Sequence, residues 1–155
     1  MKKDELTVQE LDAWRGFRRM GEVVSSRIAR EIIRETGLST ADFSILMQLS
    51  QTKAGRQRQR DLQRFLEWDK TRLSHQLTRM VRRNLVERRG EVRGNTFICL
   101  TEEGHRLLSL ARPVHREGIR EHFLSHLSEE DVVALIRVAE KLRGVNCDET
   151  NVLSR

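Results

Sequence analysis

Several residue types are scarce in this sequence, and each shortage excludes a class of protein. Aromatic residues make up 5% of the 155 residues, and Pro113 is the single proline. Together with a charged fraction of 34%, this composition indicates a mainly helical soluble protein rather than a β-sandwich or barrel. A chain of this length is expected to form one domain with a substantial hydrophobic core.

Cysteine and long apolar runs are also scarce. Cys99 and Cys147 are too few and too far apart for a disulfide framework, and there is no CxxC pair, so both are expected to be reduced thiols. No apolar run approaches the roughly 18 to 20 residues of a membrane span, and the N-terminus lacks the apolar core of a signal peptide. We therefore expect a cytoplasmic protein without membrane contact.

The motifs of common enzyme classes are missing as well. The sequence contains no HExxH, no phosphate-binding GxxxxGK motif followed by Ser or Thr, no GxSxG and no glycine-rich fingerprint after a strand. We expect neither catalytic activity nor a cofactor.

Positive charge is present and is concentrated in one region. Residues 53–93 contain 13 Lys and Arg but 5 Asp and Glu, a local net charge of +8, whereas the whole chain carries +6. Uniform charge would serve solubility equally well. The concentration therefore favours a polyanionic partner such as nucleic acid.

The centre of this basic region, from Asp69 to Asn84, reads DKTRLSHQLTRMVRRN and predicts an amphipathic helix capped by Asp69. Its predicted buried stripe consists of Leu73, Leu77, Met80 and Val81. Its opposite, polar face consists of Thr71, Arg72, His75, Thr78, Arg79 and Arg82. Short polar groups near the helix start, backed by arginines, suit a helix that reads the major groove. On this segment alone, a solvated surface helix is the alternative.

The flanking segments support the reading-helix interpretation. Residues 59–66 predict a short helix before a tight turn at Glu67 and Trp68, so the pair of helices has the helix-turn-helix pattern, while residues 53–58 read as a loop. Residues 85–89 and 96–100 predict two strands joined by GEVRGN, a two-stranded wing whose tip carries Arg93 and Asn95. The wing would reach a backbone or minor groove; an ordinary exposed hairpin is the alternative.

Both ends of the chain predict helices. Thr7 with Glu10 forms a capping box before a long helix that ends at Gly37, and Ser39 with Asp42 repeats the arrangement for a second helix. Near the C-terminus, Thr101 caps a further helix, whose long apolar series begins at Leu107 and contains Pro113, which should kink the helix or mark its restart. A last helix begins at Ser128. Helices from the two ends could form one bundle across a twofold axis.

Three stretches carry a resemblance to a known family. They are LSTADFSILMQL (38–49), DKTRLSHQLTRMVRRNLVERR (69–89) and LTEEG (100–104). In this order they resemble the second helix, the recognition helix with its first wing strand, and the second wing strand of the MarR family of winged-helix transcription regulators. The chain departs from the family pattern at Glu67, where Gly is frequent, and at the wing, where Glu91-Val92-Arg93 replaces Asp-x-Arg. The cysteine that the family's redox sensors carry early in the first helix is missing.

The resemblance implies a mainly α winged helix-turn-helix fold. Residues 1–37 and 104–155 would form a helical dimerisation region, and residues 38–103 a DNA-binding region, within one intertwined domain. It also implies a homodimer that binds a pseudopalindromic operator, usually represses, and is released by a small ligand. Base edges would be contacted by Thr71, Arg72, Ser74, His75 and Gln76. Phosphates or the minor groove would be contacted by Arg79 and Arg82 on the helix and by Arg89, Arg93 and Asn95 on the wing.

A ligand cleft is a further expectation. Trp14, Phe17 and Arg18, with Phe43 from the second helix, could line a site for a small aromatic or phenolic effector, or the three aromatic residues could be core.

Two alternative functions stay open beside the ligand-responsive repressor, and a metal-responsive regulator is the second reading. It rests on His115, His122 and His126, of which the last two have the i, i+4 spacing that can chelate zinc. A nonspecific nucleic-acid-binding or adaptor protein on the same fold is a third.

Overall fold

The computed structural model describes residues 5–90 and 96–146, and this part of the chain is mainly helical. The elements are α1 (Val8–Thr36), α2 (Thr40–Ser50), η1 (Lys53–Gly55), β1 (Arg56–Arg58), α3 (Gln59–Leu66), α4 (Lys70–Arg82), β2 (Val86–Arg89), β3 (Phe97–Leu100), α5 (Glu102–His122), η2 (Leu124–His126) and α6 (Glu129–Asn146). The predicted winged helix-turn-helix order is confirmed. None of the described helices is long and apolar enough to cross a membrane.

Local capping chemistry sets where the N-terminal helices begin and end. Thr7 and Glu10 form the predicted capping box of α1, and Ser39 and Asp42 form that of α2. Gly37 ends α1 in the left-handed conformation at φ 69°, a backbone region that glycine enters without steric cost. These short-range signals explain why both helices are predictable from sequence.

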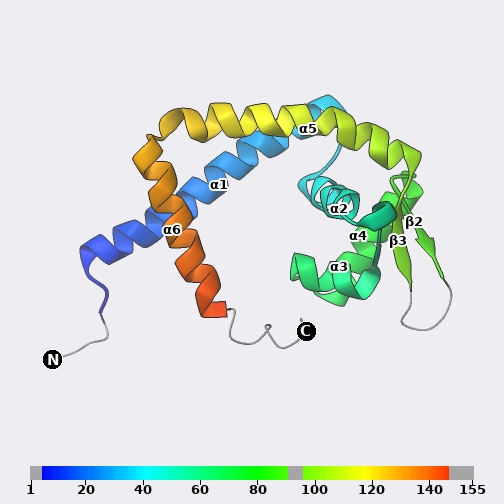
Figure 1. The fold of residues 1–155 in the computed structure, drawn as a ribbon, viewed down its shortest axis with the longest axis horizontal. Coiled ribbons are helices and arrows are strands. Elements are labelled where there is room, and N and C mark those ends of the chain that lie inside the picture. Colours follow the sequence, from blue (N-terminus) through cyan, green and yellow to red (C-terminus); the bar gives the residue numbers. More distant parts are fainter. Residues whose placement is uncertain (1–4, 91–95, 147–155) are drawn as a thin grey trace.

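The helices divide the molecule into two parts (Figure 1). α1 and α5 run side by side, α6 folds back from one end of α5, and α2, α3, α4 and the sheet lie beneath its other end. α5 continues through Pro113, so the alternative that the helix restarts there is wrong. The chain instead turns after His122, where Phe123 leaves helical geometry and η2 leads to α6.

The sheet has three antiparallel strands in the order β1-β3-β2, rather than the two predicted. The additional strand, β1, lies within the segment whose sequence predicts a loop. It pairs Arg56 with Cys99 and Arg58 with Phe97, while Val86 and Arg89 of β2 pair with the other edge of β3. A three-residue strand is too short to show an alternating pattern, and its pairing partner lies some 40 residues away, so sequence periodicity could not reveal it.

The core lies between the C-terminal half of α1, the helix-turn-helix and the first half of α5. Among its fully buried side chains are Leu38, Ile45, Leu46, Leu49, Leu62, Leu73, Leu77, Met80, Ile98 and Leu108. The predicted buried stripe of α4 is confirmed for Leu73, Leu77 and Met80, but Val81 is exposed. The buried face of α4 is therefore rotated from the predicted one, with Gln76 rather than Val81 at its edge, and a polar face remains outside.

Candidate nucleic-acid interface

The polar face of α4 is open to solvent at most of the positions where the sequence predicts DNA contacts. The exposed side chains are Thr71, Arg72, His75, Arg79 and Arg82, and Ser74 is half-buried. Asp69 caps the helix by accepting a hydrogen bond from the Arg72 backbone N–H at 2.8 Å. Because the cap and the buried stripe fix the rotation of α4, these side chains project from one side of the molecule.

Arg72 is oriented by an aromatic ring. Its guanidinium carbon lies 4.1 Å from the centroid of the Trp68 ring, a cation–π contact across the turn between α3 and α4. The turn itself is tight, and Glu67 adopts the left-handed conformation there at φ 52°. This is the position at which the sequence departs from the glycine that is frequent in the family it resembles. Trp68 therefore serves as a platform that holds Arg72 in place.

Gln76 does not lie on the open face. Its side chain is 4% exposed, and its amide donates a hydrogen bond to Asp42 Oδ1 at 2.7 Å. The prediction that Gln76 contacts bases is therefore wrong for this arrangement, because the 100° step along the helix turns it toward α2. Its other amide atom, Oε1, accepts a hydrogen bond from Arg79, so Gln76 supports an outward-facing residue from below.

Asp42 is the centre of this supporting network. Its carboxylate is 2% exposed and accepts hydrogen bonds from the Ser39 backbone N–H at 2.9 Å and from Gln76 at 2.7 Å. It also pairs with Arg83 at 2.6 Å, and Arg83 donates to the Gly37 carbonyl at 2.9 Å. A buried carboxylate is tolerated when it is paired and fully hydrogen-bonded. This network fixes the end of α4 against the start of α2.

The wing is tied to the same helix by a residue that the sequence patterns do not single out. Arg88 on β2 donates hydrogen bonds to the Ser74 carbonyl and to Thr78 Oγ1, each at 3.2 Å. Its neighbour Arg89 is exposed and pairs with Glu87 at 2.5 Å. The predicted tip contacts Arg93 and Asn95 lie outside the described residues.

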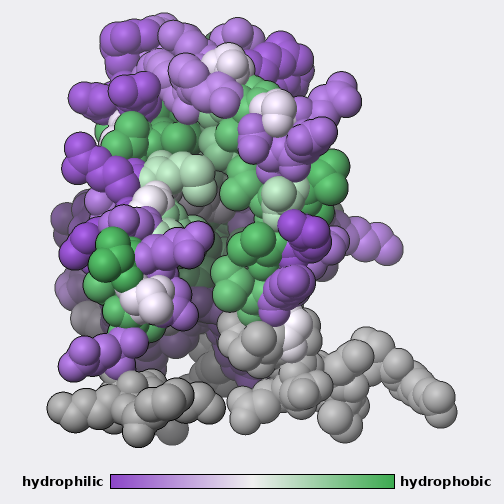
Figure 2. Space-filling model, turned by 90° about the vertical axis from the view of Figure 1, so that its left-hand side faces the viewer, coloured by the Kyte–Doolittle hydropathy of each residue, from purple (hydrophilic) through white to green (hydrophobic). Residues whose placement is uncertain are grey.

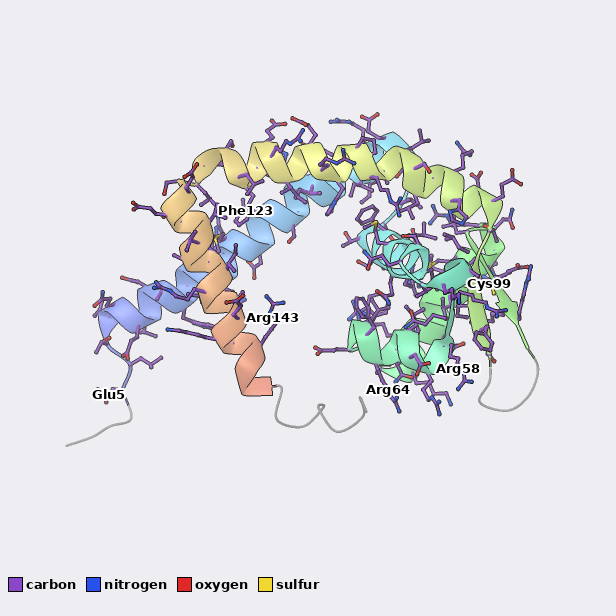
Figure 3. The ribbon with its side chains drawn as sticks, viewed as in Figure 1. Glu5, Arg58, Arg64, Cys99, Phe123 and Arg143 are labelled. Atoms are coloured by element: carbon purple, nitrogen blue, oxygen red, sulfur yellow. The ribbon has the colours of Figure 1, made fainter. Side chains whose placement is uncertain are left out.

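A second cationic group extends from the edge strand of the sheet. The guanidinium carbons of Arg56 and Arg58 lie 5.5 and 5.7 Å from the centroid of the same Phe97 ring. In the described part of the chain neither arginine makes an ion pair, and both are exposed. Figure 3 shows Arg58 and Arg64 on the side of the helix-turn-helix that faces away from α5. The β1 pairing that creates this group is long-range, so no local sequence signal reveals it.

An apolar cavity of about 390 Å³ lies where α1 and α5 meet α2 and α3. Ile28, Phe43, Met47, Phe65 and His115 are among its lining residues. The His115 ring lies 4.8 Å from that of Phe43, and burial lowers the pKa of His115 below its usual 6.5. The surface of the cavity is mainly apolar, and the His115 imidazole is one of several polar groups that line it.

The predicted ligand cleft is not assembled within one chain. Phe43 lines the cavity, but Trp14, Phe17 and Arg18 lie on the N-terminal half of α1, and Trp14 precedes the cavity residue Ile28 by about 21 Å of helix. Trp14 and Phe17 are each 56% exposed and stack on one another at 6.0 Å. The grouping of these four residues is wrong for a single chain, because this half of α1 extends beyond the core.

The three histidines of the metal alternative are not brought together. His115 lines the cavity, His122 bonds to Glu31 on α1, and His126 is exposed in η2. The i, i+4 spacing of His122 and His126 is not used because α5 ends at His122.

Comparisons with known proteins agree with the winged helix-turn-helix fold described above. The family model described as MarR family matches residues 38–91. AbsC, a MarR family transcriptional regulator from Streptomyces coelicolor, is 34% identical over 92% of this chain and 99% of its own, with a TM-score of 0.81. Sco3205, a MarR family regulator from the same organism crystallised with DNA, is 21% identical, with coverages of 95% and 97% and a TM-score of 0.85.

A third solved structure has a small molecule bound. The organohalide-sensing transcriptional regulator RdhR-CbdbA1625, in its 2,4-dichlorophenol-bound form, is 19% identical over 93% of this chain and 84% of its own, with a TM-score of 0.76. A search among curated proteins found no match.

Proposed function

Because the chain belongs to the MarR family of transcriptional regulators, we propose that it is a sequence-specific repressor that binds a pseudopalindromic operator as a homodimer. The observation that carries the proposal is the exposed polar face of α4. Its Arg79 is hydrogen-bonded to Gln76, which is in turn bonded to Asp42, and its Arg72 packs on the Trp68 ring. The likeness of the fold to a relative crystallised with DNA supports the choice of double-stranded DNA as the partner. The role is regulatory rather than catalytic, and it is exercised in the cytoplasm.

On the operator, the N-terminal half of α4 reads sequence and the rest of the surface binds the backbone. Thr71, Arg72 and His75, with Ser74 at the margin, approach base edges in the major groove, where Arg can pair bidentately with guanine. Arg79 and Arg82 meet phosphates. The wing residues Arg89, Arg93 and Asn95 meet the backbone or minor groove, and the β1 arginines Arg56 and Arg58 add phosphate contacts beside it.

Dimerisation would cover the apolar side of the helical region. Large apolar side chains exposed there include Leu6, Val8, Trp14 and Phe17 of the N-terminal segment and Val133, Ile136, Val138 and Leu142 of α6. Figure 2 shows this side of the molecule, where apolar side chains gather in two columns with a hollow between them. Exposed apolar surface of this extent indicates an interface. Residues 1–37 and 104–155 would thus form the dimerisation region, and residues 38–103 the DNA-binding region.

A small aromatic or phenolic effector would regulate DNA binding through the cavity. The cavity lies between the dimerisation helices α1 and α5 and the helix-turn-helix, so an occupant would contact both regions at once. Binding there can favour a spacing of the two recognition helices that does not fit the half-sites, which releases the DNA. Phe43 and His115 would contact the ring of the effector.

Selection of bound sequences from a random DNA pool tests the proposal. We expect a pseudopalindrome whose half-sites lie about one helical turn apart, bound more than roughly a thousandfold more tightly than random duplex. Near-equal affinity for all duplexes would overturn it in favour of a nonspecific nucleic-acid-binding role. Repeating the selection with small aromatic acids and phenols tests effector release.

A further inference from the structure

Two carboxylates and a histidine meet where α1 packs against the last turn of α5. The side-chain ligand atoms of Glu31, Glu121 and His122 all lie within 4.8 Å of one another. We propose that these three residues, here called the junction site, bind one divalent transition-metal ion such as Zn²⁺. The junction site is separate from the DNA-binding face of α4 and from the effector cavity.

The geometry of the junction site suits such an ion. Glu31 and His122 come from different helices, are 25% and 13% exposed, and lie 2.6 Å apart between Oε1 and Nε2. Imidazole nitrogen and carboxylate oxygen bind zinc at about 2.0 to 2.2 Å, which sets neighbouring ligand atoms about 3.3 Å apart in a tetrahedron. Small side-chain rotations would therefore bring all three groups to one ion, with water completing the coordination.

The backbone of α5 leaves room for the Glu31 carboxylate. A Cβ atom at Gly118 would lie 3.2 Å from Glu31 Oε2 and 3.0 Å from Ile28 Cγ1, so any side chain there would displace both. Gly118 precedes His122 by one helical turn, on the same face of α5. The missing side chain thus allows an acidic group to lie half-buried beside the imidazole.

The charges around the junction site are not balanced by the chain's abundant arginines. Every other ion pair in residues 5–90 and 96–146 involves an arginine. Among these residues Glu31 pairs with His122 alone, and no ion pair involves Glu121. Two carboxylates near one another repel, and this repulsion is removed by a cation between them. A divalent ion supplies that charge where Lys and Arg do not.

An ion at the junction site would join α1 to the end of α5. The chain leaves α5 at His122 and turns at Phe123, labelled in Figure 3, before α6 begins. Metal binding should therefore stabilise the packing of α1 on α5 next to this turn. A rise in Tm on adding metal is the expected consequence.

The test measures metal binding by the purified full-length chain. Calorimetry with Zn²⁺ and absorption spectroscopy with Co²⁺ should show one ion per chain, and the visible Co²⁺ bands should report coordination by the protein. Glu31→Gln, Glu121→Gln and His122→Gln should each weaken binding by more than roughly tenfold, since removing even a residue that only orients a metal ligand often costs that much. Each should also abolish the metal-dependent rise in Tm.

Two matched controls come from the same region. Glu117→Gln and His126→Gln remove an exposed carboxylate and an exposed imidazole close by in sequence, and both should bind metal as the parent chain does. Glu121 is itself exposed, so Glu121→Gln should keep the fold, which circular dichroism checks. Absence of Zn²⁺ and Co²⁺ binding at millimolar metal, or equal binding by the parent and Glu121→Gln, would overturn the assignment.

Discussion

The buried carboxylate of Asp42 on α2 accepts a hydrogen bond from the Gln76 amide on α4 at 2.7 Å. Asp42 also completes the capping box of its own helix and pairs with Arg83 at 2.6 Å. One side chain therefore both starts α2 and fixes the orientation of α4. The orientation of the exposed polar face of α4 thus depends on a residue that does not itself reach the surface.

Replacing Asp42 by Ala should destabilise the fold and weaken DNA binding together. The change leaves the Gln76 amide and the Ser39 N–H without their acceptor and removes the partner of Arg83, which should lower the free energy of unfolding by about 2 to 3 kcal/mol. Urea unfolding measures the decrease. Asp61→Ala, which removes a more exposed carboxylate on α3, is the control and should change stability little. Equal stabilities for the two variants would contradict the role of the network.

Replacing Arg72 by Ala should cost roughly 1 to 3 kcal/mol at the operator and relax its sequence preference, because Arg72 is assigned to a base edge. Arg82→Ala should instead weaken operator and random duplex by similar factors, because a phosphate contact carries no sequence information. Binding titrations with both duplexes separate the two outcomes. If Arg72→Ala weakened binding to operator and random DNA equally, the base-contact assignment would fail.

The arginines on β1 should contribute to the salt dependence of binding. Removing both Arg56 and Arg58 by substitution with Ala should reduce the slope of log K against log salt by about 0.9 for each phosphate that is no longer neutralised. Arg15→Ala on α1, an exposed arginine paired with Asp12 at 3.4 Å, is the control and should leave the slope unchanged. An unchanged slope in the double variant would place β1 outside the DNA interface.

The stability of the protein should depend on pH through His115. Burial lowers the pKa of His115 in the folded state, so the folded state binds fewer protons than the unfolded state once pH falls to the ordinary pKa of histidine. The stability that comes from burying the neutral ring is therefore fully present above the ordinary pKa of histidine. It is lost as pH falls from there toward the lowered pKa of the folded state. His115→Gln should show a smaller decrease in unfolding free energy between about pH 7 and pH 5 than the parent chain. Urea unfolding at each pH provides the comparison, and parallel curves would argue against this assignment.

Charged substitutions on the apolar side of α6 should prevent dimerisation. Val133→Glu combined with Ile136→Glu places two charges on side chains that are exposed in the single chain, so the folded subunit should tolerate them. Light scattering after gel filtration should then report a monomer, whereas Arg137→Glu on the same helix should remain dimeric. A dimer in the double variant would show that the interface lies elsewhere.

Sequence patterns are sufficient for features set by neighbouring residues. The capping boxes at Thr7 and Ser39 and the buried stripe at Leu73, Leu77 and Met80 are predictable, because each depends on residues three or four positions apart. Features that depend on distant contacts are not. The pairing of β1 with β3 joins segments some 40 residues apart, and a helical wheel does not show it.

The same reason explains the corrected site residues. Gln76 has the chemistry to read adenine, but its burial depends on Asp42, 34 residues away in sequence. Trp14 and Phe43 are both aromatic residues of the N-terminal region, yet α1 is long enough to keep them apart. Residue type indicates what a side chain can do, and only packing decides which residues act together.

The hydrogen bonds from Arg88 to the Ser74 carbonyl and Thr78 Oγ1 have a consequence for how operators can vary. They fix the base of the wing against the middle of α4, so under the proposed function the protein sets the offset between the groove that α4 would read and the groove that the wing would touch. A shift of the DNA segment contacted by the wing by a single base pair relative to the half-site read by α4 should therefore weaken binding strongly. The distance between the two half-sites depends instead on how the two subunits of the dimer are arranged.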